Sequence, residues 1–157
     1  MIILGLISLL LDLTILNFSN YLFGNINLFF PYLTLVYIIS YFYFGSIKKS
    51  YFIYIVIFLY SIMVNNIALT FILMGILYWF VIYIKGNFKE GPLFFFIVVV
   101  LSLIIYDVSY FLILVLFNCL SFNIFNLFYK VYNSIFLNLF YGVILYFLVP
   151  VLIAHKK

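Results

Sequence analysis

Long apolar segments alternate with short polar ones along this chain, and the alternation predicts helices that cross a membrane. Gly, Pro, Asn and charged residues mark the breaks between the segments. The break after the penultimate segment keeps some apolar character and is expected to lie along the membrane interface as a short amphipathic piece. The apolar segments cover about residues 2–16, 28–44, 51–84, 93–117 and 131–153.

The segment 51–84 is too long to be a single membrane-crossing helix. Its 34 residues would form a helix about 51 Å long, whereas the hydrocarbon core of a bilayer is about 30 Å thick. Asn65 and Asn66 lie near its middle, and Asn is a natural turn residue because it tolerates left-handed backbone geometry. We therefore expect two helices, over about residues 51–64 and 67–84, joined by a tight turn.

The distribution of lysines predicts the membrane topology. Six helices place six lysines on the side of the two termini and only Lys130 on the other side, whereas five helices would largely abolish this bias. Positive charge collects on the cytoplasmic side of membrane proteins. The predicted fold is thus all-α: a polytopic transmembrane bundle of six helices, forming one integral membrane domain over residues 1–157 with both termini cytoplasmic. The six lysines are Lys48, Lys49, Lys85, Lys89, Lys156 and Lys157.

Composition agrees with this class and excludes several functions. With 71% hydrophobic and 6% charged residues, the chain has too much apolar surface for a soluble domain of this size. The net charge of +4 is explained by orientation, so no nucleic-acid partner is expected. Cys119 and His155 are the single residues of their types, which leaves no metal site, cofactor site or catalytic motif, and we expect no enzyme. Gly5 does not form a convincing small-xxx-small packing motif.

Two acidic residues lie inside apolar segments and are the candidates for chemistry. Asp12 lies in the first segment and Asp107 near the middle of the fifth helix. A charged Asp at the bilayer centre costs about 2.5–3.5 kcal/mol, so each is expected to face the bundle interior. They either form hydrogen bonds between helices (Tyr106 and Ser109 being candidates near Asp107), contact a partner protein, or belong to a proton or cation relay.

Three stretches of the chain resemble the rod shape-determining protein MreD family. They are NLFFPYLTLVYIISYFYFGSIKKS, similar to its proline-led second helix and basic loop, FLYSIMVNNIALTFILMGILYWFV, similar to its third and fourth helices, and NLFYGVILYFLVPVLIAHKK, similar to its last helix. The chain departs from the family pattern at Ser61, where many members carry an acid, and at the Asn pair, where glycines are usual. Because of this position, Ser61 joins Asp12 and Asp107 as a candidate polar or partner contact inside the membrane.

The resemblance implies a non-enzymatic subunit of the bacterial cell-elongation (rod shape) machinery in the cytoplasmic (inner) membrane. Such a subunit docks an MreC-type bitopic protein and helps couple the actin-like MreB filament to cell-wall biogenesis by peptidoglycan synthases. The alternative is the substrate-binding component of an energy-coupling-factor vitamin transporter, which is also small, six-helical and catalytically silent. That reading requires a polar cavity near the outer face of the membrane. The richness in Phe, Tyr, Ile, Asn and Lys with no Arg indicates an A/T-rich bacterial source.

Overall fold

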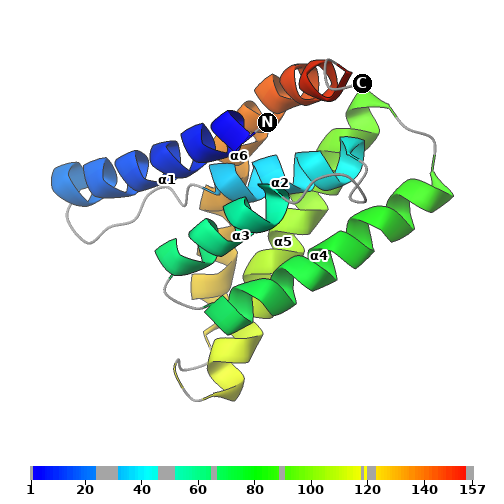
Figure 1. The fold of residues 1–157 in the computed structure, drawn as a ribbon. Coiled ribbons are helices and arrows are strands. Elements are labelled where there is room, and N and C mark those ends of the chain that lie inside the picture. Colours follow the sequence, from blue (N-terminus) through cyan, green and yellow to red (C-terminus); the bar gives the residue numbers. More distant parts are fainter. Residues whose placement is uncertain are drawn as a thin grey trace.

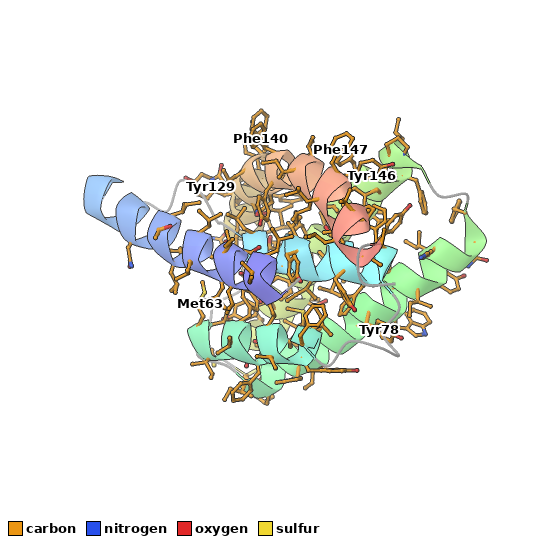
Figure 2. All side chains as sticks on the ribbon, turned by 45° about the horizontal axis from the view of Figure 1, so that its top comes forward. Met63, Tyr78, Tyr129, Phe140, Tyr146 and Phe147 are labelled. Carbon is orange, nitrogen blue, oxygen red and sulfur yellow. The ribbon has the colours of Figure 1, made fainter. Side chains whose placement is uncertain are left out.

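The computed structural model describes residues 2–23, 32–45, 52–64, 67–88, 91–117, 119 and 123–154. These residues form six α-helices and contain no strand, which confirms the all-helical prediction. The start of α1 and the end of α6 lie close together in both views (Figures 1 and 2). The helices are α1 (Ile2–Phe23), α2 (Leu33–Phe44), α3 (Phe52–Met63), α4 (Ile67–Asn87), α5 (Pro92–Leu116) and α6 (Ile124–Ala154).

The break inside the segment 51–84 is confirmed, because α3 ends at Met63 and α4 begins at Ile67. The two helices pack against each other as a hairpin. Asn65 and Asn66 themselves lie outside the described residues.

Three helix boundaries differ from the sequence-based expectation. The first helix continues to Phe23, through much of the stretch that was expected to be an Asn-rich loop. The second begins only at Leu33, several residues later than expected. The last begins at Ile124, so the predicted interfacial piece is instead continuous with α6. The two longer helices, α1 and α6, arise because Asn and other polar residues, which interrupt an apolar pattern, do not by themselves end a helix.

The short helix α2 is the centre of the bundle. It contacts all five other helices, and its residues from Leu33 to Tyr43 are all buried. Its sequence, LTLVYIISYFYF, is apolar on every face, which is the pattern of a helix surrounded by protein. Its 12 residues extend about 18 Å, which is less than the thickness of a hydrocarbon core. Figure 1 shows α2 in the middle of the bundle, below α1 and above α3 and α4.

The arrangement of polar and apolar residues is the reverse of that in a soluble protein. Large apolar side chains cover the exterior, including Trp79 and Phe136, which are 67% and 85% exposed. Phe140 and Phe147 project outward from α6 (Figure 2). Polar side chains are buried instead: Ser8, Asp12, Thr34, Ser40, Ser61, Thr70, Ser102, Asp107, Ser134 and Asn138. Three regions, α4, α5 and residues Leu127–Ala154 of α6, are long and apolar enough to cross a membrane by length and composition.

Candidate functional site

Asp12 closes the N-terminus of α2 from outside that helix. Its carboxylate, carried by α1, accepts hydrogen bonds from the backbone N–H groups of Leu33 at 2.8 Å and Thr34 at 2.9 Å. The first N–H groups of any helix have no partner inside the helix, and α2 supplies no capping side chain of its own. The carboxylate also lies at the positive end of the helix dipole. The acid of α1 therefore replaces the N-cap that the sequence of α2 lacks.

A side chain of α6 accepts a hydrogen bond from the backbone N–H group just before these two. The N–H of Tyr32 donates to Oδ1 of Asn138 at 2.8 Å. The side-chain amide of Asn138 in turn donates to the backbone carbonyl of Ser134, one turn earlier in α6. Three consecutive backbone donors at the start of α2 are thus held by two other helices, which fixes the depth of α2 in the bundle.

Asp107 of α5 is the centre of a second polar cluster, which we call the Asp107 cluster. Its Oδ1 accepts a hydrogen bond from the Tyr32 hydroxyl at 2.8 Å and lies 3.3 Å from Lys130 Nζ. Its Oδ2 accepts a hydrogen bond from Ser134 Oγ at 3.1 Å. Asp107 is completely buried, whereas the Lys130 side chain is 24% exposed. Both carboxylate oxygens are therefore occupied by groups from α6 and from the residue that precedes α2.

Lys85 near the end of α4 closes the opposite end of α2. Its ammonium donates to the backbone carbonyl of Tyr43 at 2.7 Å and lies 5.8 Å from the centroid of the Tyr43 ring. Carbonyls in the last turn of a helix have no partner inside the helix, and the dipole favours a cation there. An acid from α1 and a lysine from α4 thus match the dipole of α2 at its two ends.

A small recess lies beside the Asp107 cluster. Its volume is about 120 Å³, and its lining consists of Tyr32, Tyr60, Val64, Tyr106, Tyr110 and Lys130. The ammonium of Lys130 lies 4.9 Å from the Tyr110 ring centroid and 5.8 Å from that of Tyr32. The recess is therefore aromatic and phenolic on its walls, with an ion pair at one side.

The structure places both predicted aspartates in the interior but gives them partners that the sequence reasoning missed. Asp12 binds backbone N–H groups, and Asp107 binds Tyr32, Ser134 and Lys130 in place of Tyr106 and Ser109. Ser61 is also buried, but its hydroxyl donates to the carbonyl of Phe58 in its own helix at 2.6 Å. Hence Asp12 and Asp107 join helices, whereas Ser61 does not.

Three of the residues that the sequence reasoning missed are regularly spaced along α6. Lys130, Ser134 and Asn138 are four residues apart, so they lie on one face of a helix. Assigning residues before 131 to a loop concealed this stripe. Among the predicted topology signals, only Lys85 is described; Lys48, Lys49, Asn65, Asn66, Lys89, Lys156 and Lys157 lie outside the described residues.

This arrangement can hold helices together, and its described part forms no group of three His, Cys, Asp or Glu side chains able to hold a metal ion. No protein-family model, curated protein or solved structure matches the chain.

Proposed function

We propose that this chain is a non-enzymatic membrane subunit of the bacterial cell-elongation machinery. It docks an MreC-type bitopic protein and thereby helps couple an MreB filament to peptidoglycan synthesis. The resemblance of three stretches to the MreD family supports the identity of the machinery. The buried carboxylates support a structural role, because both are occupied by groups of the same chain.

The proposed topology is six membrane-crossing helices in the bacterial inner membrane, with both termini cytoplasmic. The contact of Lys85 with the last turn of α2 supports it, since the ends of α2 and α4 then lie on one side of the membrane. Lys130 lies near the start of α6, where the proposed topology has the external side. Reporter fusions after residue 157 and within residues 64–66 test this: cytoplasmic activity is expected from the first and periplasmic activity from the second.

An apolar groove between α3 and α4 is the observation that carries the docking function. Its volume is about 220 Å³, and Ile57, Phe71 and Gly75 are among the residues that line it. Gly75 is exposed, and a Cβ atom added there would meet nothing within 4 Å. Helices associate in lipid through close packing at small residues, because burying apolar surface there brings no hydrophobic gain. We assign this groove to the membrane helix of the MreC-type partner.

Filling the groove tests the assignment without disturbing the fold. Gly75→Leu puts a branched side chain into open space, so we expect the variant to be as stable as the wild type. We also expect recovery of the co-expressed MreC-type protein to fall at least about fivefold, which corresponds to about 1 kcal/mol of lost packing.

Gly86→Leu is the matched control, because Gly86 lies on the same helix, is equally open and does not line the groove. Equal recovery of the partner with Gly75→Leu and Gly86→Leu would overturn the groove assignment. Failure of the wild-type chain to recover any MreC-type protein would overturn the function.

The recess beside Lys130 is the one observation that favours a vitamin-transporter component instead. Ligand pockets for drug-sized molecules usually measure about 300–1,000 Å³, whereas the recess measures about 120 Å³. A vitamin would not fit without a large rearrangement, so this function is the second candidate. Mass spectrometry of the purified protein distinguishes them, because a transporter component is expected to retain its vitamin.

A further inference from the structure

The recess exists because two short helices stop where two long ones continue. Tyr32 precedes the first turn of α2, and Val64 follows the last turn of α3, so both mark helix ends. In contrast, α5 continues to Leu116 and α6 begins at Ile124, so both helices extend past the recess. The end of α5 projects below α3 and α4 in Figure 1. The other walls are contributed by Tyr60 of α3, by Tyr106 and Tyr110 of α5 and by Lys130 of α6. The recess is thus a fixed product of helix length.

The chemistry of the recess is that of a site for an ammonium cation. A cation is attracted to an aromatic ring when it lies within about 6 Å of the centroid, and Lys130 Nζ meets this condition at both Tyr110 and Tyr32. Behind these rings, the carboxylate of Asp107 lies 3.3 Å from the same nitrogen. Aromatic faces together with a buried acid are the means by which proteins bind amines and methylated ammonium groups.

We propose that this recess is a binding site for a small ammonium cation and that the side chain of Lys130 is its tethered occupant. The side chain of Lys130 is partly exposed, so its ammonium has a path from the rings to solvent. The volume of about 120 Å³ beside it leaves space for an amine with a short carbon chain. An anion is disfavoured, because Asp107 stands behind the rings and already neutralises Lys130.

Lys130→Ala and a free amine test this proposal directly. The substitution removes Nζ and the three methylenes that carry it, and n-propylammonium replaces those atoms as a separate molecule. We expect n-propylammonium to raise the melting temperature of the variant in phosphatidylglycerol nanodiscs, and to restore its folding if the variant does not fold alone. n-Propanol has the same shape without the charge, and we expect no effect from it. Equal effects of the amine and the alcohol would overturn the proposal.

Two further variants test which parts of the recess bind the amine. Lys130→Ala combined with Tyr110→Leu lacks the nearer ring and should lose most of the amine effect. Lys85→Ala removes the lysine at the other end of α2, which contacts a tyrosine ring and a backbone carbonyl and lies outside the lining of the recess. The amine should therefore not stabilise it. Equal stabilisation of Lys85→Ala and Lys130→Ala would show that the amine acts non-specifically and would overturn the site.

Affinity for the wild-type chain tests the role of Lys130 as occupant. The free amine must displace Lys130 from Asp107 and from two rings, so we expect binding to the wild type to be at least about tenfold weaker than to Lys130→Ala. Equal affinity would show that Lys130 does not occupy the site.

The natural ammonium ligand could be a lipid headgroup or a soluble amine. Nanodiscs of phosphatidylethanolamine, whose headgroup carries an ammonium, distinguish these two sources. If the headgroup is the natural ligand, n-propylammonium will bind Lys130→Ala more weakly in these nanodiscs than in phosphatidylglycerol. If its affinity is unchanged, the natural ligand is a soluble amine.

Discussion

Replacing Asp12 is the most informative perturbation of the central helix. Asp12→Leu has nearly the same length as the acid but cannot accept a hydrogen bond. It leaves the backbone N–H groups of Leu33 and Thr34, now bonded at 2.8 and 2.9 Å, without acceptors inside the bundle. Asp12→Asn keeps one carbonyl oxygen, which can hold one of the two donors.

The expected loss of stability follows from these two bonds. Leaving a buried donor unsatisfied costs about 1–3 kcal/mol in water-soluble proteins, whereas hydrogen bonds measured inside membrane proteins average about 0.6 kcal/mol and reach about 1.7. The lost interaction with the helix dipole adds up to about 2 kcal/mol in a partly buried geometry. We expect Asp12→Leu to lower the free energy of unfolding by about 2–4 kcal/mol, and Asp12→Asn by about half as much.

Unfolding in mixed micelles with increasing sodium dodecyl sulfate, followed by circular dichroism, measures these differences. Thr14→Val is the control on the same helix, because Thr14 is exposed and its hydroxyl donates to the backbone carbonyl of Leu11 within α1. It should change stability by less than about 0.5 kcal/mol. If Asp12→Leu is as stable as Thr14→Val, the carboxylate does not hold α2 and the reasoning is refuted.

Variants at three further contacts are expected to change stability in the same unfolding assay. An added Cβ at Gly5 would lie 2.8 Å from a Val56 methyl, so Gly5→Ala should cost about 1–3 kcal/mol. At Gly142 the nearest atom is 3.8 Å away, so Gly142→Ala should be neutral or stabilising, and equal effects at the two glycines would contradict this account. Lys85→Met should cost about 1–2 kcal/mol because the last turn of α2 loses a cation, and a change below 0.3 kcal/mol would refute it. Ser8→Ala and Tyr141→Phe remove the same 2.7 Å hydrogen bond, so the double variant should lose less than the sum of the single losses.

Much of the helical architecture was predictable because helix length and apolar runs are local properties of the sequence. The division at Asn65 and Asn66 followed from the thickness of a bilayer, and the structure has separate helices on either side of it. The late start of α2 was not predictable from local sequence, because its first donors are satisfied by Asp12 and Asn138, which are far away in the chain.

The candidate site was predicted only in part, for the same physical reason. That Asp12 and Asp107 would face the interior followed from the cost of exposing an acid to lipid. Their partners depend on which helix faces pack together, and this is a property of the tertiary structure. Gly5 shows the same limit, since no motif marks it, yet an added Cβ there would lie 2.8 Å from Val56 and 2.9 Å from Tyr37.

The central claim is that the buried charges hold the helices in place and form no relay that carries an ion or a proton across the membrane. Asp107→Leu alone leaves Lys130 without its carboxylate, so we expect partner assembly to weaken more than membrane insertion. Asp107→Leu combined with Lys130→Met replaces the ion pair with apolar side chains of similar volume, a change that is often neutral or stabilising.

The decisive measurement is the recovery of a co-expressed MreC-type protein with these two variants. We expect reduced recovery with Asp107→Leu and near wild-type recovery with the double variant. A double variant that is as stable as the wild type but recovers no partner would contradict the central claim, because the charges themselves would then be required.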